Sequence, residues 1–410
     1  MTEIYLRWQS QVIQKALTTR RIILLSGPRQ SGKTTLAKML KTEDINYLTL
    51  DDITLKQAAE ADPHSFIKNK SKTLIIDEIQ RVPLLLPAIK KAVDEDNRPG
   101  QFLLTGSANI QSLPNVQESL AGRVRKVRLR PLSFGEYQRK KPDFLKNVFD
   151  GSFSNSYRHY DRDEVLEIAI KGGFPEVLRL PGSEIKSWHG DYIESLIERD
   201  LKDIARIQRI DAMKALINTL AAWSGKFIDI SAIGSGLSIR RPTIESYINA
   251  LETLYLIERI KPWTKTDYDR VGKQDKLYVC DSGLMASILG YRLEQIRLDP
   301  DRSGKLIETF AFNEIASIVD WHRPEYRLYH YRDREKREID FIVERDDGAM
   351  LGIEIKAGST LGKNSFKHLE WFQNKMINNK PFKRIILYTG EHVMSFGSNL
   401  WAVPFGALWG

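Results

Sequence analysis

The stretch Gly27-Pro28-Arg29-Gln30-Ser31-Gly32-Lys33-Thr34 reads G-x-x-x-x-G-K-T, the pattern of a phosphate-binding loop. An apolar run, residues 21–26, precedes it, and helix-forming residues 34–40 follow it. Strand, glycine loop and helix are the structural context that such a loop requires. The sequence therefore predicts that the chain binds a nucleoside triphosphate, ATP, together with Mg²⁺, and hydrolyses it.

Each residue type in this loop has a physical role in holding phosphates. Glycines let the backbone approach the phosphates closely, and the start of the helix directs free N–H groups and a positive dipole at them. We expect Lys33 to reach the outer phosphates and the Thr34 hydroxyl to bind Mg²⁺. The predicted nucleotide-binding residues are Gly27, Pro28, Arg29, Gln30, Ser31, Gly32, Lys33, Thr34 and Thr35.

A second apolar run, residues 73–76, ends in two acids, Asp77 and Glu78. After a phosphate-binding loop, the first acid is expected to hold Mg²⁺ through water and the second to activate the attacking water as general base. Two acids at the end of a strand are often no more than a solvated turn. Their spacing from the loop favours the catalytic interpretation.

A third apolar run, residues 102–106, leads into small polar residues. In ATPases that have an additional strand, this strand lies between the loop strand and the acidic strand, and its end carries a polar sensor of the γ-phosphate. Ser107 or Thr105 could serve as that sensor. The alternative is an ordinary turn after a strand.

The spacing of apolar runs predicts the fold class of the first third of the chain. Strands are expected at residues 21–26, 46–50, 73–77, 102–106 and 126–130, separated by helical segments. Such alternation is typical of a parallel, doubly wound α/β sheet. The pattern then changes to charged helices, with Glu164–Ile170 and Glu184–Ile207 among them.

Several motifs in fixed order make the sequence similar to a known family. They are G-P-R-Q-x-G-K-T, I-D-E-I-Q, L-T-G-S, L-A-G-R (residues 120–123), L-x-P-L-S-F-x-E-Y (129–137) and G-G-F-P-E-V (172–177). The chain resembles the prokaryotic AAA-type ATPases of the AAA_14 plus DUF4143 architecture. The resemblance covers nearly the whole chain and implies a P-loop ATPase with a helical lid after its core.

The remaining sequence predicts two further domains. Helical periodicity from residue 210, a helix that Ser238 caps and a strand at 256–263 indicate a winged helix-turn-helix, with Arg240 and Arg241 opening its recognition helix. Winged helices also serve as protein-packing modules, so DNA contact is one of two interpretations. The predicted domains are the AAA-like core (1–132), the lid (133–208), the winged helix and connection (209–300) and a nuclease-like domain (301–410).

The last hundred residues carry a possible second active site. A helix, three strands, a helix and a strand are expected from residue 304 to residue 388, the order of restriction-endonuclease-like cores. Asp340, Glu354 and Lys356 supply the D…E-x-K signature of that superfamily, and Glu308 could add a metal ligand. The alternative is a domain that has kept this fold for binding and lost catalysis.

Charge points to a polyanionic partner. The net charge is +9, and Arg123–Lys141 holds eight basic residues and one acid, Glu136. Such a cluster can dock nucleic-acid phosphates, although it can also be a solvated strand face. Arg123 is the candidate arginine for the γ-phosphate, in cis or from a neighbouring subunit of a homo-oligomer.

Composition excludes other classes. No apolar stretch approaches the ~18 to 20 residues that span a bilayer, so no membrane association is expected. The start lacks a signal-peptide core, and Cys280 is the only cysteine, as expected for a cytoplasmic protein without disulfides. The favoured function is an ATPase that acts on nucleic acid, with DNA preferred. The alternatives are a nucleotide-dependent switch that binds a protein and, less favoured, a small-molecule kinase.

Overall fold

The chain divides into two compact units. In the computed structural model, the described residues are 4–68, 71–106, 122–154, 157–201, 210–266, 269, 273–377 and 381–410. The first unit comprises Met1–Pro131 and Leu251–Leu256, and the second comprises Leu132–Ala250 and Ile257–Gly410. The predicted subdivision of the second unit into lid, winged helix and nuclease-like domain stays a prediction.

The first unit is built on a five-stranded sheet in which every neighbouring pair is parallel. Its order is β2-β3-β4-β1-β5, so β4 lies between the loop strand and the acidic strand, as predicted. The predicted five-stranded parallel sheet is thereby confirmed. The strands are β1 (Ile22–Ser26), β2 (Ile45–Thr49), β3 (Thr73–Asp77), β4 (Phe102–Gly106) and β5 (Val124–Arg128).

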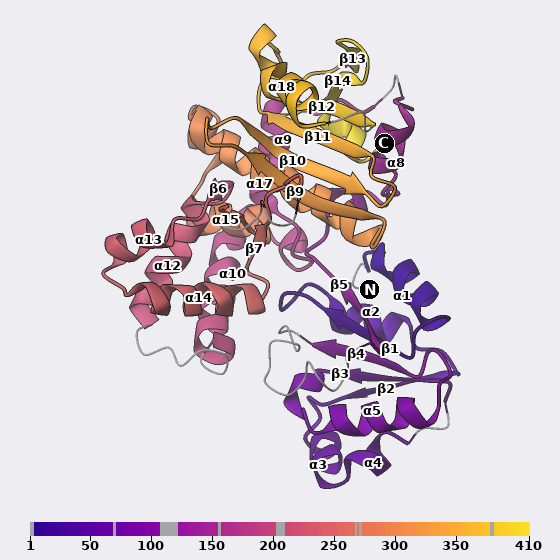
Figure 1. Cartoon of the computed structure of the whole chain (residues 1–410). Coiled ribbons are helices and arrows are strands. Elements are labelled where there is room, and N and C mark those ends of the chain that lie inside the picture. Colours follow the sequence, from indigo (N-terminus) through magenta and orange to yellow (C-terminus); the bar gives the residue numbers. More distant parts are fainter. Residues whose placement is uncertain are drawn as a thin grey trace. The chain divides into compact units, whose positions relative to one another are not determined.

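Helices cover both faces of this sheet because alternate side chains of its buried strands point to opposite faces. Leu24, Ile76 and Leu104 share one apolar cluster with the helices that follow β2 and β3, whereas Leu25 and Leu103 share the other with α1 and α2. Figure 1 shows α5 on one side of the sheet and α1 on the other. The helices are α1 (Gln9–Leu17), α2 (Lys33–Met39), α3 (Ile53–Ala61), α4 (Pro63–Phe66) and α5 (Leu85–Glu95).

The second unit begins with helices and a small antiparallel sheet. From α12 to β8 the elements follow the order helix, strand, helix, helix, strand, strand. The three strands form a sheet in the order β6-β8-β7. The elements are α7 (Phe134–Tyr137), α8 (Phe144–Asp150), α9 (Arg162–Lys171), α10 (Gly182–Ser195), a π-helix (Leu196–Leu201), α12 (Ile210–Ala222), β6 (Lys226–Phe227), α13 (Ile230–Leu237), α14 (Arg241–Thr253), β7 (Ile257–Ile260), β8 (Lys276–Val279), α15 (Ser282–Ile288) and α16 (Leu293–Ile296).

The structure corrects one helix boundary in this region. Ser238 was expected to cap the third helix at its start, but it ends α13 instead, in the left-handed conformation with φ of 52°. The chain then passes through Arg240 before α14 begins at Arg241. Asp229, in contrast, caps α13 by accepting a hydrogen bond from the Ala232 N–H.

The rest of the second unit is a six-stranded mixed sheet with a long helix before it, and its elements follow the order predicted from the sequence. The sheet order is β13-β14-β12-β11-β10-β9, in which β9, β10 and β11 are antiparallel and β11 and β12 are parallel. The elements are α17 (Pro300–Trp321), β9 (Tyr326–Arg332), β10 (Glu338–Arg345), β11 (Met350–Lys356), α18 (Lys367–Met376), β12 (Phe382–Tyr388), β13 (Met394–Ser395) and β14 (Leu400–Pro404).

The G-G-F-P-E-V motif has a packing role in this unit. A Cβ atom on Gly173 would lie 1.9 Å from the Leu132 carbonyl oxygen, and the Gly173 N–H donates to the buried Asp281 carboxylate at 2.7 Å. Asp281 also caps α15 through the Leu284 N–H. The motif therefore joins α15 to the segment after α9. In the described part of the chain, no helix is both long and apolar enough to cross a bilayer.

Candidate nucleotide-binding site

The loop between β1 and α2 has a backbone that its glycines make possible. Gly27 has φ of 157°, and a Cβ atom at this position would lie 2.0 Å from the Leu129 carbonyl oxygen. Gly32 has φ of 94° and precedes the first residue of α2. Side chains at either position would therefore strain the loop or collide with the continuation of β5. The geometry supplies the close, unobstructed backbone that bound phosphates need.

Lys33 lies inside the loop. Its side chain is buried, and its ammonium donates hydrogen bonds to the carbonyl oxygens of Gly27 at 3.0 Å and Pro28 at 2.7 Å. The charge is thus held at the centre of the loop, beside the N-terminus of α2. This arrangement fits a triphosphate, because the ammonium and the helix N-terminus both favour anionic oxygens there.

A buried arginine that the sequence analysis missed braces the loop. The Arg7 guanidinium donates to the Ser31 carbonyl oxygen at 2.7 Å and to the Arg130 carbonyl oxygen at 2.6 Å. Ser31 belongs to the loop itself, and Arg130 follows β5 beside it, so Arg7 links the loop to the segment after β5. A single arginine near the N-terminus carries no motif, so nothing in the sequence marked it.

Asp77 lies at the centre of the site, at the end of β3. Its Oδ2 accepts hydrogen bonds from the Thr34 hydroxyl at 2.9 Å and from the Tyr47 hydroxyl at 2.7 Å, and its Oδ1 accepts from the Thr105 hydroxyl. The two residues predicted to contact Mg²⁺, Thr34 and Asp77, thus lie within hydrogen-bond distance of each other, and both offer the hard oxygen donors that Mg²⁺ prefers. Burial and the Asp77 carboxylate raise the pKa of Tyr47. Tyr47 was not anticipated.

Glu78 is held in an uncommon backbone conformation. Its φ of 58° is left-handed, a conformation that costs energy for a side chain other than glycine. The Glu78 N–H donates to the Thr105 hydroxyl at 3.2 Å, and its carboxylate accepts from the Gln80 amide. Burial raises the pKa of Glu78. A carboxyl whose basicity is increased suits the predicted role of general base.

The two sensor candidates have different outcomes. Thr105 lies in the site, where its hydroxyl connects Asp77 of β3 with the backbone of Glu78. Ser107 lies outside the described residues, and its role stays a prediction. In the loop, Pro28 and Ser31 are buried, Arg29 is half-buried, and Gln30 and Thr35 are exposed.

Arg123 is not brought to the phosphate-binding loop of its own chain. It immediately precedes β5, whose first residue pairs with the first residue of β1, whereas the loop follows the last residue of β1. Its guanidinium donates to the Asp94 carboxylate at 2.5 and 3.0 Å. The two ends of a five-residue strand lie roughly 13 Å apart. Arg123 therefore does not reach a γ-phosphate in the loop of its own chain. Contact with the γ-phosphate of a neighbouring subunit stays a prediction.

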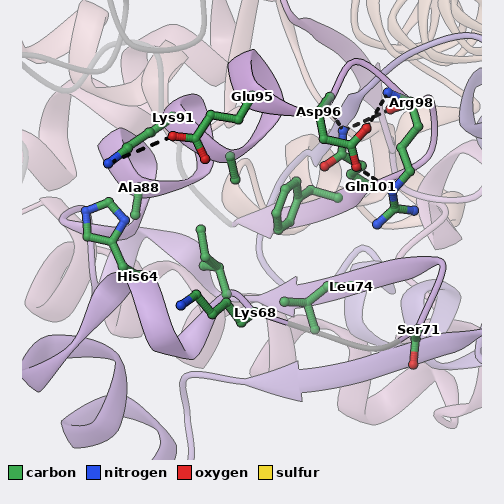
Figure 2. Close-up of a pocket in the computed structure, with 13 residues that line it drawn as sticks. His64, Lys68, Ser71, Leu74, Ala88, Lys91, Glu95, Asp96, Arg98 and Gln101 are labelled. Atoms are coloured by element: carbon green, nitrogen blue, oxygen red, sulfur yellow. Dashed lines mark hydrogen bonds and ion pairs between the residues drawn. The ribbon is translucent and has the colours of Figure 1, made fainter.

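A pocket of about 460 Å³ opens at the end of the sheet where the strands begin, the end at which Arg123 also lies. Leu74 and Phe102, at the beginnings of β3 and β4, line it, and Figure 2 shows His64 and Lys68 on one side of it. Its lining residues include no part of the phosphate-binding loop. This pocket is therefore separate from the nucleotide site.

The structure also brings together the four residues predicted as a second site. Phe341 of β10 pairs with Ile353 of β11, and next to this pair the Asp340 Oδ2 accepts from the Ile355 N–H at 2.9 Å. The Lys356 ammonium lies 3.3 Å from the Glu354 Oε2. Glu308 of α17 reaches the same cluster, because one ammonium contacts both it and Asp340.

That ammonium belongs to Lys276, which the sequence analysis missed. Lys276 begins β8, is fully buried, and contacts Glu308 at 2.8 Å, Glu338 at 2.6 Å and Asp340 at 3.3 Å. A lysine at the start of an apolar run looks like an ordinary strand end. Its position depends on the packing of β8 against α17 and β10, which no local pattern encodes.

Comparison with protein families assigns the first unit. Residues 19–138 match the family model described as an AAA domain, AAA_14. This is an AAA-type ATPase-like domain. Residues 162–295 and 303–408 match two domains of unknown function, DUF8612 and DUF4143. The AAA_14 and DUF4143 parts of the expected resemblance are thus confirmed, and we call the first unit the AAA domain.

Relatives share most of the chain at low identity. Uncharacterized protein Rv2008c of Mycobacterium tuberculosis is 27% identical over 397 residues, which cover 96% of this chain and 82% of the relative. Uncharacterized protein MJ1544 of Methanocaldococcus jannaschii is 24% identical over 402 residues, covering 92% and 85%.

Solved structures give weak similarities. A point variant of RuvB from Thermotoga maritima has a TM-score of 0.29 and 18% identity, covering 61% of this chain and 88% of that chain. AMPPCP-bound DnaA from Aquifex aeolicus has a TM-score of 0.29 and 15% identity, covering 59% and 86%. The assignment of the AAA domain accordingly rests on the family match and on the geometry of the loop.

Proposed function

We propose that the AAA domain hydrolyses ATP with Mg²⁺. The observation that carries the proposal is the 2.9 Å hydrogen bond between the Thr34 hydroxyl and the Asp77 carboxylate. It joins the phosphate-binding loop to the acidic strand at the point where both would meet a cation. Bound Mg²⁺ supplies neutralising charge to the phosphates. Thr34 and Asp77 are the residues that would hold it.

The chain's own groups divide the remaining work. Lys33 and the N–H groups at the start of α2 bind and orient the outer phosphates. Glu78 takes the proton from the attacking water, and its raised pKa favours that transfer. Gln80 orients the Glu78 carboxylate, and Thr105 links the Asp77 carboxylate to the backbone N–H of Glu78.

The test separates binding from hydrolysis. Phosphate release and equilibrium nucleotide binding are measured for the full chain with ATP and Mg²⁺, in the parent and in Glu78→Gln. We expect the variant to bind ATP as the parent does and to release phosphate at least about 100-fold more slowly, since general-base catalysis contributes about 10²- to 10⁴-fold. Glu60→Gln, an exposed glutamate of α3, is the matched control. Hydrolysis by Glu78→Gln at the parental rate would refute this assignment of the base.

Nucleic acid, DNA above all, is the partner that we propose for the second unit. The order helix, strand, helix, helix, strand, strand from α12 to β8 supports the predicted winged helix-turn-helix. Arg240 and Arg241 stand exposed at the start of α14, its third helix, which is where such domains contact DNA. Arg241 also forms an exposed ion pair with Glu245 at 2.9 Å, a weak interaction that DNA phosphates can replace.

Salt dependence tests this partner. Binding of fluorescent duplex and single-stranded DNA is measured across salt concentrations for the parent and for the double variant Arg240→Ala/Arg241→Ala. Each neutralised phosphate contributes about 0.9 to the slope of the logarithm of the binding constant against the logarithm of the salt concentration. Loss of both arginines should therefore make this slope shallower by about 2. Lys214→Ala, on the exposed face of α12, should leave the slope unchanged. Lack of binding to any nucleic acid would favour the protein-binding switch.

A further inference from the structure

A lysine is buried among carboxylates in the second unit. Lys276 is inaccessible to solvent, and its ammonium contacts Glu308 of α17 together with Glu338 and Asp340 of β10. An ammonium has three N–H donors, and three carboxylates surround this one. A buried charge without such partners is very costly, so the arrangement satisfies the lysine and binds three segments of the chain together.

The same carboxylates are those predicted to hold a metal ion. An ion shared by Asp340 and Glu308 would lie about 2.0 to 2.6 Å from an oxygen of each. The Lys276 ammonium contacts both, at 3.3 and 2.8 Å. A divalent ion and an ammonium cannot occupy this position together. The Glu308 Oε1, which also accepts from the Tyr278 hydroxyl at 2.7 Å, and the Asp340 Oδ1 are therefore not open to a metal ion while Lys276 holds this position.

Two further oxygens of the predicted site are also engaged. The second oxygen of Asp340 accepts from the Ile355 N–H, and the Oε2 of Glu354 contacts Lys356. The Oε1 of Glu354 is buried and accepts no hydrogen bond from the described residues. Three of the four carboxylate oxygens of Asp340 and Glu354 are therefore already held by Lys276, Lys356 or the backbone.

We propose that the Lys276 ammonium is the resident cation of the carboxylate cluster formed by Glu308, Glu338 and Asp340, in place of a divalent metal ion. Lys276 of β8 then holds α17 and β10 together without a metal ion. The second unit accordingly lacks metal-dependent nuclease activity. The predicted nuclease-like fold survives in this interpretation as a scaffold. The proposal concerns a site that shares no residue with the AAA domain, so it stands or falls independently of ATP hydrolysis.

The first test replaces the resident cation. Thermal unfolding and Mn²⁺ binding, the latter by electron paramagnetic resonance, are measured without nucleotide for the full-length parent and for Lys276→Met. The Met side chain is similar in length and uncharged. In EDTA we expect the variant to unfold about 10 °C lower, because three carboxylates lose their counter-ion. Mn²⁺ should then bind the variant and raise its unfolding temperature by about 5 to 10 °C.

Two further variants make the result specific. The gained Mn²⁺ binding should disappear in Lys276→Met/Asp340→Asn, which removes one ligand of the created site. Lys356→Met, which removes the ammonium beside Glu354, should gain no Mn²⁺ binding, because that side chain is 40% exposed and leaves Lys276 in place. If Lys276→Met does not fold, the double variant Lys276→Met/Glu308→Gln takes its place, because it removes one charge of each sign. A double variant that folds and unfolds at a temperature near that of the parent would support the pairing of Lys276 with Glu308.

Other results would overturn the proposal. The first is that the parent binds Mn²⁺ and that Asp340→Asn abolishes this binding. The second is that the parent cleaves DNA or RNA with Mn²⁺ and that Lys356→Ala abolishes this cleavage. Either would place a metal ion beside Asp340 despite the lysine. The third is a folded Lys276→Met protein that gains no Mn²⁺ binding, since the carboxylates would then not form a cation site at all.

Discussion

Asp77 ends the buried strand β3 and Asp340 lies in the partly buried strand β10. Each carboxylate touches residues from several segments, but their partners differ. Asp77 accepts hydrogen bonds from three hydroxyl groups, those of Thr34, Tyr47 and Thr105. Asp340 contacts an ammonium, that of Lys276, and a backbone N–H. Hydroxyl donors orient a carboxylate and leave its charge in place, whereas an ammonium neutralises it. The first arrangement still attracts a cation, and the second already contains one.

The largest effect is expected on ATP hydrolysis when the Asp77 and Asp340 charges are removed in separate variants. Asp77→Asn should slow ATP hydrolysis by at least about 100-fold, because the amide cannot support Mg²⁺ charge as a carboxylate does. Asp340→Asn should leave hydrolysis within about twofold of the parent. Phosphate release at saturating ATP and Mg²⁺ measures both. Equal losses in the two variants would contradict the division of roles.

A third buried carboxylate, Glu314, sharpens the comparison because neutral donors surround it. It accepts from the Trp409 indole N–H at 2.6 Å and from the Phe134 N–H at 2.7 Å. Burial raises its pKa to about 7, from an ordinary value of 4.5. The folded protein therefore binds a proton more tightly than the unfolded chain does. This contribution to stability is complete below about pH 4.5 and is lost as the pH rises through 7.

The corresponding prediction is a pH-dependent free energy of unfolding. The difference between a pKa of 4.5 in the unfolded chain and about 7 in the folded protein corresponds to about 3 kcal/mol. The second unit should therefore lose up to that amount of unfolding free energy between about pH 4.5 and 8. Denaturant unfolding at several pH values checks it, with Glu314→Gln as the comparison. The variant is expected to lose a hydrogen-bond acceptor at every pH, yet its pH slope should be flatter by one proton. Identical slopes would exclude Glu314 as the source.

A smaller effect is expected on stability at Asp340. Asp340→Asn leaves the buried Lys276 ammonium with two carboxylates and should cost about 1 to 3 kcal/mol of unfolding free energy. Asp77→Asn should cost less than about 1 kcal/mol, since its neighbours are hydroxyl groups from which an amide oxygen can still accept. Chemical denaturation of both variants at one pH measures the difference. A larger loss for Asp77→Asn would reverse the comparison.

The sequence predicted the first region far better than the second, for a physical reason. The phosphate-binding loop and the two acids lie in short motifs that continue directly from strands, so Lys33, Thr34, Asp77 and Glu78 could be assigned from local pattern alone. The parallel order of the strands followed from the same pattern. Tyr47 could not be found, because its hydroxyl reaches Asp77 from another strand of the sheet.

The second region depends on contacts between distant segments. The D…E-x-K spacing correctly brought Asp340, Glu354 and Lys356 together. It could not show that a lysine 64 residues before Asp340 would contact the Asp340 carboxylate. Ser238 was misassigned because a serine before a helical run can end the previous helix as well as begin the next. Such features depend on tertiary packing, which local periodicity does not record.

The smallest expected effect concerns the hydroxyl groups around Asp77. Tyr47→Phe removes one of its three donors and keeps the ring, so the carboxylate should lose orientation and keep its charge. A hydrogen bond to a charged group is worth about 1.5 to 3 kcal/mol, and water can replace part of this one because Tyr47 is half-buried. We therefore expect ATP turnover about 3- to 10-fold slower, with ATP affinity nearly unchanged. A turnover equal to that of the parent would mean that Thr34 and Thr105 suffice to position Asp77, and a loss as large as that of Asp77→Asn would mean that orientation matters as much as charge.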